Sequence, residues 1–309
     1  GYVYGLSSDP ARTHHFTEML RRHNIEVYSL VQNLEADGEQ FESGSAFVVP
    51  SDQKQYKFIE ALFERRTTFS DSLFYDVSTW TMPYAYNLPF AELGSREYST
   101  NLLGSRVEGI PDMPTGEVIG GRSDYAYLFE WDGYYAPRSL NRILKEGIRA
   151  KVAAEPFTAV ISNGAREFDY GTILVPVGPQ KVEAETIHRL VEQAAAEDAL
   201  TVYAVQTGLT PNGIDLGSST FEDLEKPNVA ILAGDGTSSY EVGEAWHLLD
   251  QRYAMTPTLI TKDRFGYADI SRYNVIVLVN GGYGDFSEST VEKLKNWVRE
   301  GGTLIATKY

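Results

Sequence analysis

Cysteine is absent from this chain of 309 residues, which excludes disulfides, thiolate metal ligands and a cysteine nucleophile within it. Long apolar runs are absent too: none approaches the roughly 18 residues that suggest a transmembrane helix, so no membrane span is expected. Basic residues are few, with 27 Lys and Arg against 43 Asp and Glu and a formal net charge of −16. Because such a surface repels phosphate backbones, no nucleic-acid partner is expected.

A pattern of apolar residues and glycines is present twice. Residues 2–4 (Tyr-Val-Tyr) recur as residues 125–127 (Tyr-Ala-Tyr), at an offset of 123. Residues 41–54 recur as residues 168–181 at an offset of 127, and each copy ends in Gln-Lys. The shared order of elements predicts a duplicated supersecondary unit. Since the shared positions include no catalytic acid, base or nucleophile, the duplication describes a scaffold.

Three units are expected along the chain. The first, 1–122, carries an aromatic-rich insertion; the second, 123–226, ends in a polar linker; and the third spans 227–309. In the first two units the expected strands are residues 2–6, 25–28, 45–50, 125–129, 148–152, 171–176 and 200–205. The expected helices there are residues 10–23, 53–66, 136–146 and 181–197.

The third unit has the pattern of a parallel sheet. Residues 229–233 (Val-Ala-Ile-Leu-Ala) form a near-continuous apolar run, which is typical of a strand buried on both faces. Further strands are expected at residues 258–261, 274–279 and 303–306, with helices at 239–252 and 287–300. Alternating strands and helices imply right-handed crossovers and parallel pairing. The predicted fold class is therefore α/β, with two duplicated units followed by a parallel-sheet unit.

Glycine-rich turns follow two strands of the third unit. Parallel sheets bind ligands at the carboxyl ends of their strands, and exposed amides in such turns can hold an anion or an oxyanion. The candidate ligand-binding residues are Gly234, Asp235, Gly236, Asn280, Gly281, Gly282 and Tyr283. The alternative is that these glycines only form tight turns before helices. No catalytic residue is assigned.

Other motifs favour ordinary structural roles. Gly234 and Gly236 lack the third glycine of a dinucleotide fingerprint, because Ser239 stands in its place. Ser238 or Ser239 is expected to cap the following helix, since no Gly-x-Ser-x-Gly elbow surrounds them. Four aromatic residues either stack on a sugar or peptide or fill a core: Tyr75, Trp80, Tyr84 and Tyr86.

Histidines and a glutamate gather on the first expected helix. They are His14, His15, Glu18 and His23, and the second and third have the His-x-x-Glu spacing of zinc motifs. Catalytic zinc needs a third ligand and an open position, and the distant His188 and His247 offer no supporting spacing. We therefore expect a solvated polar face and assign no metal or cofactor.

Residues 229–234, 275–282 and 294–307 carry a first resemblance. Together they look like the first half of a class I glutamine amidotransferase-like domain, which implies a flavodoxin-like unit from residue 227. The turn at Gly281 and Gly282 is similar to the family's oxyanion loop. In that family the nucleophilic cysteine lies on a later elbow, and this chain stops before it, so no catalytic residue is carried over.

A second resemblance rests on residues 71–83, 125–128, 140–144 and 168–176, followed by the amidotransferase-like unit. This succession looks like the region downstream of the catalytic domain in large secreted bacterial zinc carboxypeptidases. The family's zinc ligands, a His-x-x-Glu pair and a distant His, belong to a peptidase domain that is not recognisable here. Zinc is therefore expected only in that absent domain.

The two resemblances imply a non-catalytic accessory region of a secreted zinc carboxypeptidase-like protein, serving as a scaffold or in substrate recognition. Its expected partners are the peptidase domain of the same parent chain and a peptide or glycan, in a secreted or periplasmic location. Both ends of the sequence look cut, which is typical of a segment from a longer protein. The alternatives are a hydrolase or amidotransferase-like enzyme, or a small-molecule or sugar-binding module, at the crevice beside Gly234 and Gly281.

Overall fold

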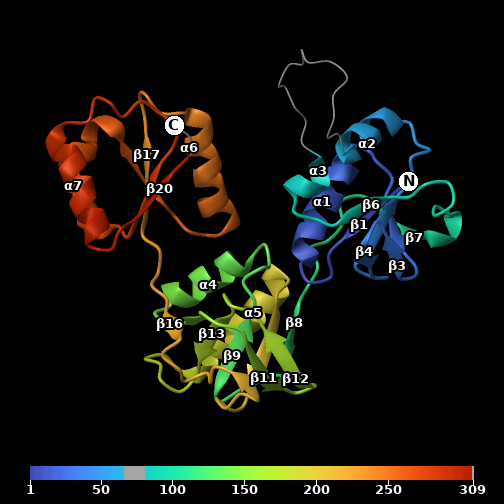
Figure 1. Cartoon of the computed structure of the whole chain (residues 1–309), viewed down its shortest axis with the longest axis horizontal. Helices are drawn as coiled ribbons and strands as arrows, with labels where there is room; N and C mark the ends of the chain where they lie inside the picture. Colours follow the sequence, from blue (N-terminus) through green and yellow to red (C-terminus); the bar gives the residue numbers. More distant parts are fainter. Residues whose placement is uncertain (66–80, 308–309) are drawn as a thin grey trace. The chain divides into compact units, whose positions relative to one another are not determined.

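The computed structural model describes residues 1–65 and 81–307. It has a mixed α/β architecture with several sheets, one of which is parallel (Figure 1). The chain divides into two compact units. The first comprises Gly1–Glu117, Asp132–Tyr134 and Ala195–Thr201, and the second contains the remaining residues.

The first unit is built on an antiparallel sheet with the order β6-β1-β5-β2-β7. Its strands are β1 Tyr2–Gly5, β2 Tyr28–Leu30, β5 Ala46–Val49, β6 Phe90–Glu92 and β7 Leu103–Arg106. Its helices are α1 Pro10–Arg22, α2 Tyr56–Phe63, α3 Met82–Ala85 and the 3-10 turn Thr100–Leu102. A hairpin of β3 (Leu34–Ala36) and β4 (Glu39–Phe41) adds a second, two-stranded sheet.

The two faces of the first sheet have different covers, because successive side chains of a strand point to opposite sides. Tyr4 of β1 packs with Phe16 of α1 and Phe63 of α2 on the helix-covered face. Val3 belongs to the other face, where Phe41 of the hairpin packs in the same buried cluster. Both sides of this sheet are therefore buried.

Helix α1 begins where the sequence places a helix start. The Asp9 side chain accepts a hydrogen bond from the Arg12 amide (3.0 Å), and Pro10 occupies the first helical position. Arg21 and Arg22 lie in the last turn, where positive charge complements the helix dipole. Capping and charge thus fix both ends of the helix.

A second antiparallel sheet has the order β16-β10-β13-β9-β14-β8. Its strands are β8 Glu117–Ile119, β9 Ala126–Phe129, β10 Lys151–Ala153, β13 Ile173–Pro176, β14 Thr201–Val205 and β16 Phe221–Asp223. A three-stranded sheet accompanies it, made of β11 Phe157–Ile161, β12 Gly164–Phe168 and β15 Asn212–Gly213. The helices of this part are α4 Ala136–Lys145 and α5 Ala184–Asp198.

The first two sheets share part of their order, β1-β5-β2 in one and β9-β13-β10 in the other. Tyr4 is paired with Phe47 across the first sheet, and Tyr127 with Val175 across the second. The hydroxyls of Tyr4 and Tyr127 both bond to helix residues, Thr17 at 2.7 Å and His188 at 2.5 Å. The register therefore gives an offset of 128 between Phe47 and Val175, one more than the 127 that the sequence pattern predicts.

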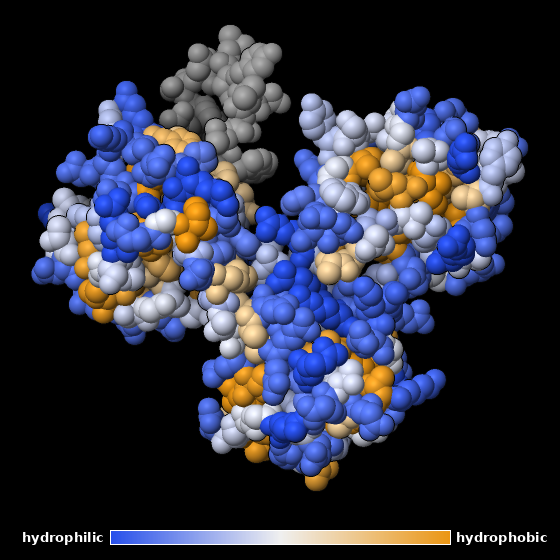
Figure 2. Space-filling model, turned by 180° about the vertical axis from the view of Figure 1, so that it is seen from behind, coloured by the Kyte–Doolittle hydropathy of each residue, from blue (hydrophilic) through white to orange (hydrophobic). Residues whose placement is uncertain are grey.

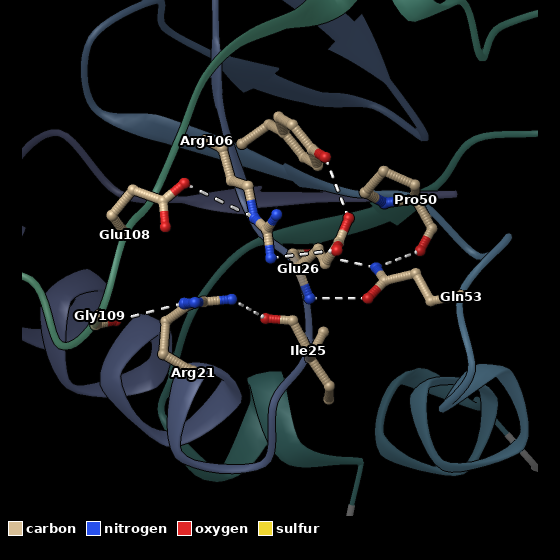
Figure 3. A network of polar contacts seen from close by, with 9 residues as sticks. Arg21, Ile25, Glu26, Pro50, Gln53, Arg106, Glu108 and Gly109 are labelled. Carbon is tan, nitrogen blue, oxygen red and sulfur yellow. Dashed lines mark hydrogen bonds and ion pairs between the residues drawn. The ribbon is translucent and has the colours of Figure 1, made fainter.

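A glutamine clamp also occurs in both antiparallel parts, and Figure 3 shows the one formed by Gln53. The Gln53 side chain accepts from the Glu26 amide (2.6 Å) and donates to the carbonyls of Glu26 (3.0 Å) and Pro50 (2.7 Å). Gln180 accepts from the Arg149 amide (2.8 Å) and donates to the carbonyls of Arg149 (2.9 Å) and Pro176 (2.6 Å). Each glutamine ties the segment after a helix to the end of a strand.

The parallel sheet has the order β18-β17-β19-β20. Its strands are β17 Val229–Ala233, β18 Thr258–Thr261, β19 Val275–Leu278 and β20 Thr303–Ala306. Its helices are α6 Ser239–Trp246, a π-helical continuation at His247–Arg252, 3-10 helices at Lys262–Tyr267 and Ile270–Arg272, and α7 Glu288–Arg299. As predicted, the pairing is parallel and β17 is buried on both faces, with Ala230 and Leu232 in one cluster and Val229 and Ile231 in the other.

The visible surface is mostly hydrophilic, with apolar residues in separate patches (Figure 2). Within residues 1–65 and 81–307, no helix has the length and apolar character needed to cross a bilayer. The mostly hydrophilic surface agrees with the acidic composition of the chain.

Candidate functional site

Two turns meet at the carboxyl end of the parallel sheet. The turn after β17 contains Gly234 and Gly236, both with positive φ, at 93° and 81°. The turn after β19 contains Gly281 and Gly282, and the Gly282 amide donates to the Gly236 carbonyl (2.9 Å). A Cβ on Gly281 would lie 2.6 Å from that same carbonyl oxygen, so only glycine permits this approach. The structure thus brings the two predicted turns together.

Two amides of the second turn are engaged in internal hydrogen bonds. The Asn280 amide donates to Oε2 of Glu241 (2.8 Å), and the Gly282 amide is bonded to Gly236. The Tyr283 hydroxyl donates to the Val279 carbonyl (2.7 Å), and its ring packs edge-on against Phe286. An oxyanion at this turn would have to compete with each of these contacts.

A pocket of about 840 Å³ opens beside the first turn. Its walls come from the turn after β17, the end of β18, the following 3-10 helix and the start of α7. The lining residues are Gly234, Asp235, Gly236, Thr261, Lys262, Asp263, Gly266, Tyr267, Asp285, Phe286, Ser287, Ser289 and Thr290. Of the seven predicted residues, Gly234, Asp235 and Gly236 line this pocket.

Lys262 lines the pocket and is held by contacts with the loop after β19. Its side chain is only 12% exposed, and its ammonium donates to the Gly282 carbonyl (2.6 Å) and to both carboxylate oxygens of Asp285 (3.1 and 2.9 Å). The hydrogen bond from Lys262 lowers the pKa of Asp285, which keeps this carboxyl ionised. The lysine thereby connects the end of β18 to the loop after β19.

The pocket rim combines hydroxyl groups with aromatic rings. Ser287 caps α7 by accepting from the Thr290 amide (3.2 Å), so both hydroxyls are held at the helix start. Phe286 stacks on the buried Phe265 with ring centroids 5.6 Å apart. Tyr267, by contrast, is 94% exposed at the pocket edge.

The described lining of the pocket combines carboxylates, hydroxyls and one ammonium. No histidine is among its described lining residues, and an activated hydroxyl needs a base within hydrogen-bond reach. His188 belongs to helix α5 and is buried against Tyr127 of β9, which is part of a different sheet from the strands beside the pocket. The Thr261 hydroxyl is hydrogen-bonded to Asp263, and the carboxylates, hydroxyls and one ammonium of the pocket can bind polar ligands.

Lys262 and Asp285 did not emerge from the sequence, although each has a local signal. Lys262 directly follows a strand, as the glycine turns do, and Asp285 closes the glycine-rich segment after β19. The glycine pattern does not mark these positions, because neither of them has a positive φ. A rule that inspects every residue directly after a parallel strand would have found Lys262, whereas Asp285 lies seven residues beyond the end of β19.

The other residues that the sequence singled out lie in different environments. Ser238 caps α6, as predicted, by accepting from the Glu241 amide (3.4 Å). Tyr86 packs edge-on against Phe16 in the first core, whereas Tyr84 is 59% exposed. Tyr75 and Trp80 lie outside the described residues.

The histidines of α1 are not on a solvated face. His14, His15 and Glu18 are all half-buried, and ligand atoms of the three side chains lie within 4.8 Å of one another. The prediction of a solvated surface is wrong for these three residues, because Asp112 contacts His14 and the Tyr134 ring packs against His15. His23 is exposed, as predicted.

No family model, curated protein or solved structure matches this chain. Its function must therefore be inferred from the geometry and chemistry of its own residues.

Proposed function

We propose that this chain is a non-catalytic binding and scaffolding region whose pocket beside Lys262 takes a polyhydroxylated ligand, such as a sugar. One observation carries the proposal: three carboxylates and an exposed tyrosine surround a polar pocket without a histidine among its described lining residues. The carboxylates are those of Asp235, Asp263 and Asp285.

The lining chemistry favours hydroxyl groups over anions. An ionised carboxylate is a pure acceptor with two oxygens, which suits the paired hydroxyls of a sugar. The single ammonium, Lys262, is already neutralised by Asp285, so a phosphate or carboxylate ligand would meet net negative charge. Tyr267 offers an amphipathic ring on which the apolar face of a sugar can stack.

The wider setting of the proposal comes from the sequence resemblance. We infer an accessory region of a secreted or periplasmic zinc carboxypeptidase-like protein, in which this pocket holds glycan or peptide substrate for a peptidase domain of the same chain. The strand order β18-β17-β19-β20 supports a flavodoxin-like third unit, and the common order of the two antiparallel sheets supports a duplication.

An amidotransferase-like or hydrolytic activity is the weaker alternative. The amides of Asn280 and Gly282, the expected oxyanion donors, already have acceptors, and the described pocket residues include no general base of the histidine type. Binding without turnover fits these contacts better.

Ligand binding is tested by thermal unfolding and calorimetry with a panel of mono- and oligosaccharides, inorganic phosphate and acidic peptides. A saccharide should raise Tm, because it binds only the folded state. Tyr267→Ala and Asp235→Asn should each weaken binding, while Tyr240→Ala, which removes a tyrosine that is 84% exposed outside the pocket, should leave it unchanged. Phosphate binding without saccharide binding would overturn the proposal.

Absence of catalysis is tested separately. The chain is incubated with and without zinc on peptides with free carboxyl ends, and released amino acids are measured. No turnover is expected, and robust zinc-dependent release would contradict the accessory role.

A further inference from the structure

Helix α1 presents two imidazoles and a carboxylate to a common point. Glu18 lies one helical turn after His14, at i+4, and also at i+3 from His15, so both histidines are its neighbours on the helix surface. Nδ1 of His15 is 3.4 Å from Oε2 of Glu18. The side chains of His15 and Glu18 are only 15% and 23% exposed.

The surroundings prepare these groups as ligands. A hydrogen bond with the Asp112 backbone involves one ring nitrogen of His14. In metal sites a backbone carbonyl commonly takes the second ring N–H of a ligating histidine and so fixes the tautomer. The other nitrogen of His14 can then direct its lone pair to the cluster.

Glu18 divides its two oxygens between different partners. Arg22 donates to Oε1 through Nε (3.1 Å) and Nη2 (2.7 Å), while Oε2 is the oxygen near His15. Arg22 therefore competes for Oε1 of Glu18, while Oε2 is the oxygen on the side of His15.

We propose that His14, His15 and Glu18 form a binding site for one divalent transition-metal ion, of the class of Zn²⁺, Ni²⁺ or Cu²⁺. Two imidazoles and one carboxylate suit these ions and disfavour Mg²⁺ and Ca²⁺, which prefer oxygen ligands alone. Ligands of a tetrahedral zinc at about 2.0–2.1 Å lie roughly 3.3 Å apart, so small side-chain rotations close the cluster around an ion. Water completes the coordination.

This site is independent of the proposed sugar pocket, because it belongs to the first compact unit and the pocket residues to the second. The test uses the whole, tag-free chain, dialysed against chelator. Titration with Zn²⁺ and Ni²⁺ is followed by calorimetry, and Co²⁺ binding by its visible absorption spectrum. One equivalent should bind with a saturable isotherm.

Variants assign the site. His14→Ala, His15→Ala and Glu18→Gln should each weaken binding by at least about tenfold, by analogy with losses at supporting residues of metal sites. Arg22→Gln should tighten it, since a competing cation and its hydrogen bonds to Oε1 are removed. His247→Ala is the matched control, because it removes an exposed histidine outside the cluster and should change nothing.

Two results would overturn the site. One is a wild-type chain that binds no metal saturably; the other is unchanged affinity in both His14→Ala and Glu18→Gln. If an alanine variant fails to fold, as judged by its thermal transition, the proposal is tested by the Co²⁺ spectrum of the wild type and by the expected tighter binding of Arg22→Gln. Absence of both contradicts the proposal.

Discussion

At the scale of single residues, Lys262 connects the end of β18 with the loop after β19, beside the pocket, through its ammonium. Its ammonium satisfies a backbone carbonyl and a carboxylate from a loop that lies about twenty residues further along the chain. A hydrogen-bonded charge of this kind contributes mainly because its loss leaves partners unsatisfied. The same residue therefore links stability with the shape of the binding site.

Lys262→Met should destabilise the fold by about 1–2 kcal/mol, because the Gly282 carbonyl and Asp285 lose their donor. The loss of stability stays small because Asp285 is 66% exposed and water replaces part of the interaction. Urea unfolding measures the change. Lys295→Met, at an ion pair 3.8 Å long with a lysine that is 58% exposed, is the control and should cost less than about 0.5 kcal/mol. Equal losses in both variants would contradict the role of Lys262.

Asp9 gives a prediction of pH dependence. Burial raises its pKa above the ordinary value, so the folded state binds a proton more readily than the unfolded state. Stability from this group is therefore present at low pH and falls as pH rises through the folded-state pKa. Asp9→Asn keeps the helix cap but cannot titrate. As the pH falls from about 7 to about 4, the free energy of unfolding of the wild type should therefore rise relative to that of Asp9→Asn. Unfolding curves across that range measure the difference, and a constant difference would refute it.

At the scale of elements, the sequence patterns predicted buried strands and capped helices but missed the short strands of the hairpins. Strand β17 and helix α1 were predicted because burial on both faces and capping leave clear marks at Val229–Ala233 and Asp9. The hairpins were missed because their strands are short and only half apolar. Asp37 and Gly38, both with positive φ, are the turn signal that would have found the first hairpin.

The candidate site was predicted only in part, for a related reason. Glycine marks backbone geometry and therefore led to the turns at Gly236 and Gly281. Lys262 has a local signal in its position after β18, but its contact with Asp285, 23 residues further along the chain, is a tertiary contact that no local pattern encodes. The strand register likewise depends on tertiary packing, which is why the offset at Phe47 differs by one residue from the sequence pattern.

Gly281→Ala should destabilise the parallel-sheet part by about 1–3 kcal/mol, because the new Cβ overlaps the Gly236 carbonyl oxygen. Gly282→Ala is the adjacent control: no heavy atom lies within 4 Å of its added Cβ, and its φ is not positive. Thermal unfolding compares the two. A control variant as unstable as Gly281→Ala would contradict the steric argument.

The glutamine clamps should be equivalent in energy. Gln53→Ala and Gln180→Ala each remove three hydrogen bonds to backbone groups, so each should cost about 1–2 kcal/mol. Gln40→Ala, whose side chain makes an exposed bond to Glu35, should be nearly neutral. Denaturant unfolding distinguishes these cases, and neutral clamp variants would show that water replaces the bonds.

At the scale of the whole molecule, charge is the property that the sequence determines most directly. The net charge of −16 sets a repulsive field for polyanions. The chain should therefore pass through heparin and duplex-DNA columns even at low salt and bind an anion exchanger. Retention on DNA that weakens with salt would contradict this expectation.

The direct bond between Gly236 and Gly282 has a consequence for molecular recognition. Since the loops around the pocket are held by each other and by Lys262 before any guest arrives, little ordering entropy remains to be lost on association. A guest should therefore find a rigid, preorganised receptor whose backbone is the same when occupied and when vacant.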